Sequence, residues 1–351
     1  MIGGIATPSD VRTVAPWKSL RGLGTEYLDD PPARDAPRPL RHLHRIGSAS
    51  CTSRARVRPV GRTGLGGSWY VGGGLGRIAT AMRDRLLALG GRIEFGGVEV
   101  SRVSTDDRGR VDGGVLLADG GHVPADIVVA NADARQVYDR LVPRRSGRIP
   151  STLLRRSTPS LSGFVLLLAL DNPPADQAHH HVLFAEDYDE EFDAVFGFNG
   201  PPRPVTRPTV YISAPDDPEI VPGPDTGAWF VLVNAPRHDP EHGVDWDAPG
   251  LAESYADQIM QVMADRGLDV RDRVRHRLLV TPADLERRTM TPGGSIYGSS
   301  SNGPRAAFLR PKNTSPVPGL YLVGGSSHPG GGLPLVMMSA KIVADLIEGA
   351  R

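Results

Sequence analysis

Apolar runs along the chain predict strands in two regions. Short apolar runs without a polar break, typical of buried strands, lie at Ala125–Ala130 and Leu320–Val323. Between them, five more runs predict a second sheet: residues 162–170, 182–185, 209–214, 229–235 and 274–280. Long strands with few intervening helices favour a mixed or antiparallel sheet in an α+β layer.

The remaining periodic stretches predict two helices and a hairpin. A helix is expected over 75–89, capped by Gly90–Gly91, and an amphipathic helix over 248–266. Two short strand pieces are expected over 92–103, and a hairpin over 111–123. The apolar face of the first helix carries Ile78, Met82, Leu86 and Leu89.

The segment after Pro318 combines a strand, a glycine-rich loop and a helix start. Five glycines lie from Gly324 to Gly332, so the backbone there can approach a ligand closely or take positive φ. Pro334 suits the first turn of a helix. A helix N-terminus directed at such a loop predicts a site for an electron-rich ligand group, although a glycine-rich βα turn without a ligand is the alternative.

Three strings of this segment resemble the C-terminal FAD-binding motif of the phytoene desaturase family of carotenoid dehydrogenases. They are Gly-Leu-Tyr-Leu-Val-Gly from Gly319, His-Pro-Gly-Gly-Gly from His328, and the helix start. The resemblance implies that the helix N-terminus faces the pyrimidine edge of the isoalloxazine and that the backbone at Val100 meets the adenine. The implied FAD-binding residues are Val100, Gly324, Gly325, Gly332, Leu333, Leu335 and Val336.

The resemblance extends over residues 8–31 and 67–351. Residues 67–79 and 292–311 are similar to family segments near the flavin, with Ser68 and Gly72 departing from the usual pattern. Family members open with a βαβ unit that carries Gly-x-Gly-x-x-Gly, and none precedes Ser9. The chain is therefore expected to begin partway through the family's sequence, and as an inactive fragment to be unstable, without tightly bound flavin or desaturase activity.

Residues 32–66 carry eight arginines, one acidic residue and almost no apolar period. A basic arm for nucleic acid or anionic lipid and a solvated disordered loop are two interpretations. We favour a third, a frameshift. Codons for Pro39–Gly47, read one base later, give Arg-Tyr-Ala-Thr-Tyr-Thr-Gly-Ser, which is very similar to the family's next segment. We expect poor order in this stretch.

The predicted fold class is α/β and α+β. It comprises a split, Rossmann-like FAD-binding domain that lacks its N-terminal βαβ unit, and a substrate domain with a mixed sheet. The expected parts are 1–66, a remnant of the helical substrate region; 67–134, the second half of the FAD domain; 135–315, the substrate domain; and 316–351, the C-terminal FAD-binding segment.

Composition narrows the function classes. The 40 basic and 40 acidic residues balance, which argues against a nucleic-acid binder. A single cysteine, Cys51, excludes a disulfide framework and a cysteine metal cluster. The longest apolar run, Phe164–Leu170, is too short to span a bilayer, and no signal peptide is visible. We expect a cytoplasmic protein, with peripheral association at the inner membrane surface as a further expectation.

Two patterns suggest other chemistry. Gly74–Ala79 fits Gly-x-Gly-x-x-Ala with Glu94 at the spacing of a ribose carboxylate, as in an NAD site, but Trp69–Val71 is a poor buried strand. The run His179–His181 has no third metal ligand at a convincing spacing, so no metal is expected.

The resemblance implies an FAD-dependent oxidoreductase that removes hydride and proton equivalents from a long, lipophilic polyene and passes electrons to quinone or oxygen. No catalytic residue is assigned. The alternatives are an NAD-dependent dehydrogenase that uses Gly74–Ala79, a non-catalytic lipid-binding module, and a decayed gene product. Desaturase, oxygenase, isomerase and retinol-reductase relatives are not distinguished.

Overall fold

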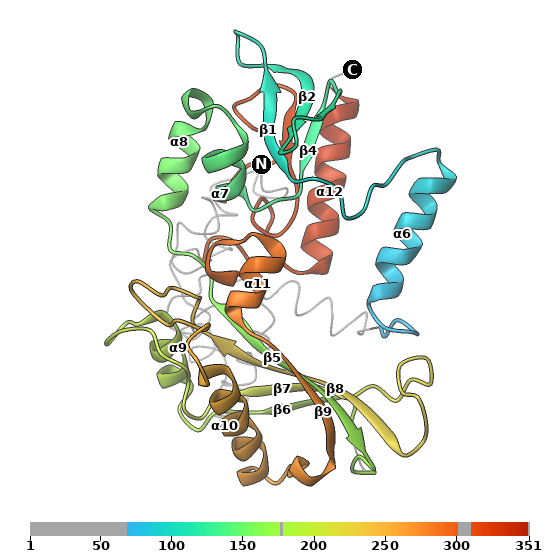
Figure 1. The fold of residues 1–351 in the computed structure, drawn as a ribbon, viewed down its shortest axis with the longest axis vertical. Coiled ribbons are helices and arrows are strands. Elements are labelled where there is room, and N and C mark those ends of the chain that lie inside the picture. Colours follow the sequence, from blue (N-terminus) through green and yellow to red (C-terminus); the bar gives the residue numbers. More distant parts are fainter. Residues whose placement is uncertain (1–68, 176–177, 301–309, 350–351) are drawn as a thin grey trace, which may run out of the picture. The chain divides into compact units, whose positions relative to one another are not determined.

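The computed structural model describes residues 69–175, 178–300 and 310–349, which fall into two compact units (Figure 1). Unit 1 contains residues 98–161 and 287–351, and unit 2 contains residues 67–97 and 162–286, within the described ranges. The boundaries predicted at 134 and 315 both lie inside unit 1. The frameshift and the poor order expected for 32–66 concern residues outside the described part of the chain.

The described part of unit 1 begins with a three-stranded antiparallel sheet. Its order is β1 (Val100–Thr105), β2 (Val111–Leu117) and β3 (His122–Val123). The β2–β3 hairpin confirms the predicted one, and Gly120 takes the positive φ of 88° that its turn requires. Of the two strand pieces expected over 92–103, only β1 forms.

A parallel pair, β4 (Val128–Ala130) and β10 (Leu320–Leu322), forms the second sheet of unit 1, with Leu320 opposite Val128. Leu320 and Leu322 are buried, which confirms the predicted buried strand. The strand predicted over 125–130 is shorter and only half-buried, since Val129 is 46% exposed. Successive side chains of a strand point to opposite faces, and only the Val128 and Ala130 face packs on the core.

Among the described residues, the helices of unit 1 are α7 (Ala134–Gln136), the π-helical turn η2 (Val137–Leu141), α8 (Arg144–Arg155), the 3-10 turn η4 (Pro292–Gly294) and α12 (Leu333–Glu348). The long helix α12 begins one residue before Pro334, which confirms the predicted start. The hydrophobic core of unit 1 consists of Val103, Val111, Ala134, Val137, Tyr138, Val142, Val317, Leu320 and Leu322.

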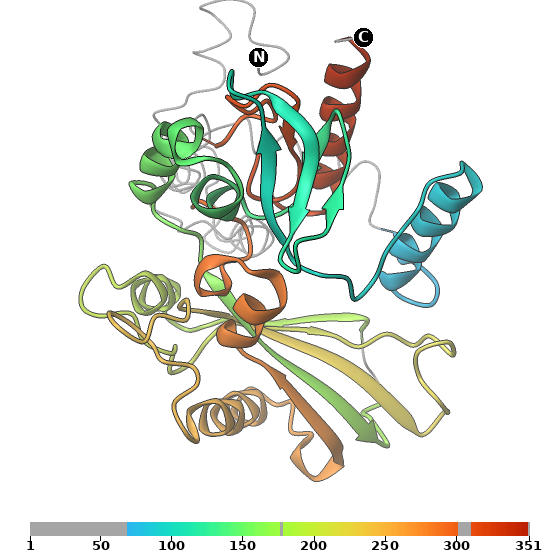
Figure 2. The same ribbon diagram turned by 45° about the horizontal axis from the view of Figure 1, so that its top comes forward.

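Unit 2 is built on a five-stranded antiparallel sheet (Figure 2). Its order is β6 (His180–Leu183), β7 (Val210–Ser213), β8 (Thr226–Ala235), β5 (Ser162–Asp171) and β9 (Val274–Val280). All five predicted strands are present. They pair antiparallel throughout, which is one of the two sheet types expected from the strand pattern, and they do not form the mixed sheet given for the substrate domain. Strand β6 lies two residues earlier than expected.

Helix α10 (Leu251–Asp265) covers one face of this sheet and confirms the predicted amphipathic helix. Its buried Tyr255 packs edge-on against Phe164 of β5, with ring centroids 5.1 Å apart. The opposite face also carries apolar side chains. Leu278, Leu167 and Phe230 lie side by side across three strands and are 52%, 38% and 38% exposed.

The other helices of unit 2 are α6 (Gly76–Ala88), α9 (Tyr188–Phe196), the 3-10 turn η3 (Arg271–Arg273) and α11 (Pro282–Thr289), which crosses the boundary at residue 286. Helix α6 confirms the prediction for 75–89. Gly91 N donates to Leu86 O and Gly90 N to Leu87 O, the two bonds of a Schellman cap, as the glycines predicted. Among the described residues, no helix combines the length and apolar character needed to cross a membrane.

Candidate functional site

The segment 324–332, here called the glycine loop, connects β10 with α12 in unit 1 and begins beside the end of β4. Val323 N donates to Ala130 O at 3.0 Å, which extends the parallel ladder by one bond. Gly324 follows with φ 104°, and a Cβ there would overlap the Asn131 side-chain oxygen. Both the conformation and the close approach therefore require glycine at position 324.

Two buried polar side chains, Asn313 and Ser339, hold the loop in place by hydrogen bonds. Asn313 Nδ2 donates to Leu322 O at 3.0 Å, to His328 O at 2.9 Å and to Ser339 Oγ at 2.9 Å. Gly324 N donates to the same Ser339 hydroxyl at 3.3 Å. These bonds join the end of β10, the middle of the loop and the second turn of α12. Hydrogen bonds within the protein therefore fix the conformation of the loop.

His328 has a structural place in this loop. Its backbone N–H donates to Pro311 O at 2.8 Å, and its own carbonyl accepts from Asn313. Burial lowers the pKa of its imidazole, and the charge of Arg310 acts in the same direction. The side chain is therefore neutral at physiological pH, and no charge of its own opposes or attracts a ligand.

The start of α12 is open in the part of the chain that the structure describes. Gly332, at φ 101°, is the N-cap; among the described residues no side chain caps the helix, and no atom lies within 4 Å of the position of a Cβ at Gly332. Leu333, the first helical residue, is 48% exposed. Uncapped amides, the positive end of a sixteen-residue helix and an apolar surface together fit the electron-rich edge of a flat heterocycle such as a flavin.

A second loop packs on the glycine loop. The ring of Tyr297 lies where a Cβ of Gly331 would be, so residue 331 must be glycine. At Gly298, with φ 64°, a Cβ would lie 2.6 Å from Ser326 Cβ. This second loop therefore touches the glycine loop at two points, through the Tyr297 ring at Gly331 and through Gly298 at Ser326.

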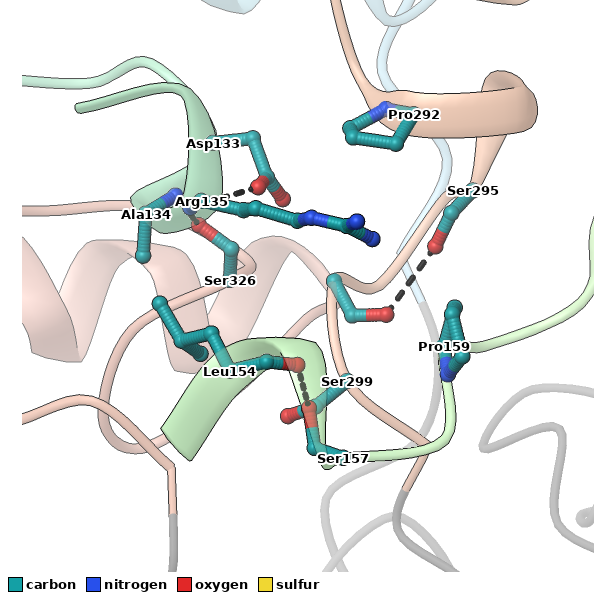
Figure 3. A pocket seen from close by; sticks show the side chains of 11 residues that line it. Asp133, Ala134, Arg135, Leu154, Ser157, Pro159, Pro292, Ser295, Ser299 and Ser326 are labelled. Atoms are coloured by element: carbon teal, nitrogen blue, oxygen red, sulfur yellow. Dashed lines mark hydrogen bonds between the residues drawn. The ribbon is translucent and has the colours of Figure 1, made fainter. Parts of the chain in front are cut away.

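A small, open pocket lies beside this contact (Figure 3). Asp133 caps α7 by accepting from Arg135 N at 2.8 Å, and Ser326 Oγ accepts from Ala134 N at 2.9 Å. Burial raises the pKa of the Asp133 carboxyl, and hydrogen bonds from backbone amides oppose that rise. The pocket is lined by Asp133, Ala134, Arg135, Leu154, Ser157, Pro159, Pro292, Ser295, Gly298, Ser299 and Ser326.

Six of the seven site residues predicted from sequence lie on one continuous piece of unit 1. Gly324, Gly325 and Gly332 lie in the loop, and Leu333, Leu335 and Val336 form the first turn of α12. Val100 begins β1, an edge strand of the three-stranded sheet. The sequence placed Asn131, Asp133, Tyr297 and Arg310 in segments that resemble the family, but it assigned no role in the site to them, or to Asn313 or Ser339. A polar Asn-x-Asp directly after a parallel strand was the one local signal for the first two.

The two alternative patterns take other forms in the structure. Residues 69–71 form no strand, and α6 is followed by no strand before β1, so Gly74–Ala79 does not lie in a βαβ unit of the described chain. In the histidine run, His180 Nδ1 lies 2.9 Å from Tyr211 Oη, and the two rings stack.

Among the described residues, the ligand atoms of His238, Asp245 and Asp247 lie within 4.8 Å of one another. His238 Nδ1 accepts from Trp246 N at 3.2 Å, so one of its two nitrogens already serves the turn. We assign no ion to this group.

A family model described as flavin-containing amine oxidoreductase matches residues 50–348. The chain is 32% identical over 336 residues to a hydroxyneurosporene desaturase of Rubrivivax gelatinosus, covering 94% of this chain and 60% of that protein. It is 31% identical over 339 residues to a lycopene-forming phytoene desaturase of a Paracoccus species, covering 94% and 65%. It is 34% identical over 288 residues to a 4,4'-diapolycopene oxygenase of a Methylomonas species, covering 80% and 55%.

The chain thus spans between about half and two thirds of the length of these curated relatives. Among solved structures, putrescine oxidase bound to putrescine superposes with a TM-score of 0.54 at 16% identity, covering 99% of this chain and 70% of that one. This likeness concerns the fold.

Proposed function

The chain belongs to the flavin-containing amine oxidoreductase family, and on that premise we propose that it acts as an FAD-dependent oxidoreductase on a long polyene of the carotenoid type. The single observation that carries the proposal is the open start of α12 next to a glycine loop whose conformation is fixed by the buried side chains of Asn313 and Ser339. The family's cofactor is FAD.

Within this proposal, the glycine loop and the first turn of α12 hold the flavin. Gly324 and Gly325 let the backbone run close to the ribityl or phosphate chain, and Gly332 leaves space for the ring. The N-terminal amides of α12 favour the negative charge that a flavin gains on reduction. The apolar side chains of Leu333, Leu335 and Val336 exclude water from that edge.

Val100 has a separate role in the proposal, as a backbone contact for the adenine. It begins β1, which lies at the edge of its sheet. The outer backbone groups of an edge strand are not used by the ladder, so they remain available to the hydrogen-bonding edge of a base.

The proposal keeps the division into parts expected from the sequence. These parts are a remnant of the helical substrate region (1–66), the second half of the FAD domain (67–134), the substrate domain (135–315) and the C-terminal FAD-binding segment (316–351).

The substrate class rests on the relatives and on unit 2. The relatives named above are carotenoid desaturases and an oxygenase. The row formed by Leu278, Leu167 and Phe230 offers an exposed, uncharged surface that suits a hydrocarbon chain. Bound FAD supplies the oxidant, taking up the two electrons released when a C–C single bond loses two hydrogens and becomes a double bond.

A substrate of this kind resides in lipid, so the proposal includes a cytoplasmic protein that works at the inner membrane surface. It includes no metal and no nucleic-acid partner. We name no catalytic acid or base, because the flavin carries the redox chemistry and the protein's task is to hold substrate and exclude water.

The test is a titration of the purified chain with FAD, followed by flavin fluorescence and absorption, in Gly325→Leu beside the original protein. A Cβ at Gly325 makes only a 3.4 Å contact with Gly331 Cα, so most of the leucine would extend into the space assigned to the ligand. The control is Gly97→Leu, since no atom lies within 4 Å of a Cβ there. The sequence led us to expect a fragment without tightly bound flavin, but the glycine loop is held in place by hydrogen bonds within this chain. We therefore expect saturable FAD binding that Gly325→Leu abolishes and Gly97→Leu preserves.

Activity is then tested with phytoene in lipid vesicles, following the longer-wavelength absorption of each added double bond. Unchanged FAD binding in Gly325→Leu would refute the assigned site. Binding of a nicotinamide nucleotide in place of FAD would favour the dehydrogenase alternative. Polyene binding without flavin would favour the lipid-binding module.

A further inference from the structure

Arg310 lies beneath the glycine loop of unit 1. Its side chain is almost fully buried, at 9% exposure. Nη1 donates to Gly325 O at 2.8 Å and to Tyr297 O at 3.0 Å, and Nη2 donates to Ser299 O at 3.1 Å. One guanidinium thus holds carbonyl groups from two loops that are separate in sequence.

The same side chain also touches the far limb of the glycine loop. A Cβ at Gly330 would lie 3.3 Å from Arg310 Nε and 3.4 Å from Cζ, so glycine at 330 makes room for the guanidinium plane. With its bond to Gly325, Arg310 contacts the loop on both sides of its central turn. A planar fork with fixed donor directions can hold several carbonyls at set angles, which a flexible ammonium cannot.

The loop that carries Tyr297 is itself fixed at its other side. Ser160 N donates to Gly298 O at 2.8 Å, and Tyr297 N donates to Ser160 Oγ at 3.0 Å. Ser295 Oγ also donates to Gly298 O at 3.0 Å. Arg310 therefore fastens the glycine loop to a rigid neighbour.

We propose that Arg310 is a positioning residue for the FAD site: its guanidinium joins residues 297–299 to both limbs of the glycine loop and places a permanent positive charge behind that loop. The proposal rests on the FAD-binding role argued above for the loop.

The charge matters in addition to the bonds. Arginine stays protonated at all physiological pH values. A cation 2.8 Å from the backbone of Gly325 favours any anionic group that the loop holds, and it favours a reduced, more negative flavin over an oxidised one. Loss of the charge should therefore make the reduction potential of bound flavin more negative.

Two variants separate the bonds from the charge. Arg310→Gln removes the charge and most donors, whereas Arg310→Lys keeps the charge but loses the planar fork. Lys312→Gln is the matched control, because it removes an exposed cation two residues further along the same segment. Hydrogen–deuterium exchange of the chain without FAD reports the loops, and FAD titration and flavin potentiometry report the site.

For Arg310→Gln we expect at least tenfold faster exchange at residues 297–299 and 325–331, at least tenfold weaker FAD binding, and a more negative flavin potential. Arg310→Lys should show faster exchange and weaker FAD binding with an unchanged potential. Lys312→Gln should match the original protein in all three. Original exchange rates and FAD affinity in Arg310→Gln would overturn the proposal.

If Arg310→Gln does not fold, Arg310→Lys decides alone. If Arg310→Lys keeps the original exchange rates of the loops and the original FAD affinity, the role proposed for the planar guanidinium is wrong. If its flavin reduction potential shifts, the role proposed for the charge is wrong. A chain that takes up no FAD refutes the proposed function instead, while the exchange comparison still tests the role of Arg310.

Discussion

Asn313 Nδ2 lies 2.9 Å from Ser339 Oγ, and both side chains are buried. This bond connects the segment before β10 with α12, and the same amide reaches Leu322 O and His328 O. Asn313→Leu, which has a similar volume, would leave these acceptors without the donor. Each buried polar group left unsatisfied costs about 1–3 kcal/mol.

We therefore expect Asn313→Leu to lower the free energy of unfolding by about 3 kcal/mol, measured by urea denaturation. The control is Asn199→Leu, at an exposed position. Equal midpoints for the two variants would show that the amide does not hold the loop.

The contact between Tyr297 and Gly331 makes a second prediction. In Gly331→Ala the new methyl group would overlap the tyrosine ring, and overpacking of this kind costs about 1–3 kcal/mol. Tyr297→Ala should relieve the overlap, so the double variant should be more stable than the sum of the single effects predicts. A coupling energy of about 1 kcal/mol or more in thermal or urea unfolding would confirm direct contact, and strict additivity would contradict it. Gly223→Ala, at a position with no atom within 4 Å, is the control.

A third prediction separates helix stability from cofactor binding. Leu333→Glu places a negative charge in the first turn of α12, where it stabilises the helix by about 0.3–1 kcal/mol. The same charge repels an electron-rich ligand at that helix start. We expect an equal or higher melting temperature together with FAD affinity weaker by about tenfold, or about 1.4 kcal/mol. Leu346→Gln, near the other end of the helix, should leave FAD affinity unchanged; a similar loss there would point to a general effect of polarity on α12.

Glu191 gives unit 2 a pH dependence. Its carboxylate is fully buried, accepting from Thr209 N at 3.0 Å and Asn234 Nδ2 at 2.8 Å. Burial raises the pKa of this carboxyl above its ordinary value of 4.5, although these hydrogen bonds oppose the rise. A raised folded-state pKa contributes stability that is complete below the unfolded pKa and is lost as pH rises through the folded pKa.

The free energy of unfolding should therefore fall as pH rises above about 4.5. Glu191→Gln cannot ionise, so its stability relative to the original protein should increase with pH, whatever fixed penalty its altered hydrogen bonds impose. Denaturant unfolding at several pH values tests this. Parallel curves for the two proteins would contradict it, and Glu241→Gln, at an exposed carboxylate, serves as the control.

Asp217 anchors the segment before α6 within unit 2. Its Oδ2 accepts from Tyr70 Oη and from Gly73 N, each at 2.7 Å, and its Oδ1 accepts from Glu219 N at 2.9 Å. Asp217→Ala removes all three bonds. We expect the amides of Gly73 and Glu219 to exchange with solvent at least tenfold faster, measured by hydrogen–deuterium exchange. The neighbouring exposed Asp216 provides the control as Asp216→Ala; similar exchange in both variants would remove the anchoring role.

The sheet of unit 2 could be predicted because its strands are long and apolar, and β5, β7, β8 and β9 lie close to the expected positions. Strand β6 was displaced because His180 and His181, which carry no apolar signal, join the ladder. Helix α9 was missed although Asp187 caps its start and Gly197, at φ 70°, ends it. Capping signals without a long apolar period were not sufficient.

The candidate site divides along the same line. Its glycine loop and helix start were predicted, since they form one continuous segment with a distinctive composition. The residues that shape the loop could not be, because Arg310 reaches Gly325, and Tyr297 reaches Gly331, through tertiary contacts alone. No periodic pattern in a sequence records which distant carbonyl a side chain will meet.

The parallel pairing of β4 with β10 has a kinetic consequence. All the strands of the unit 2 sheet lie between these two along the chain, so the pair closes a very long loop. During synthesis, β4 leaves the ribosome long before its partner exists, whereas the antiparallel sheet of unit 2 is complete earlier. Pairings of such high sequence separation form slowly. Among the described residues, β4 therefore has no strand partner until β10 has been made, and until then its backbone groups form an open strand edge.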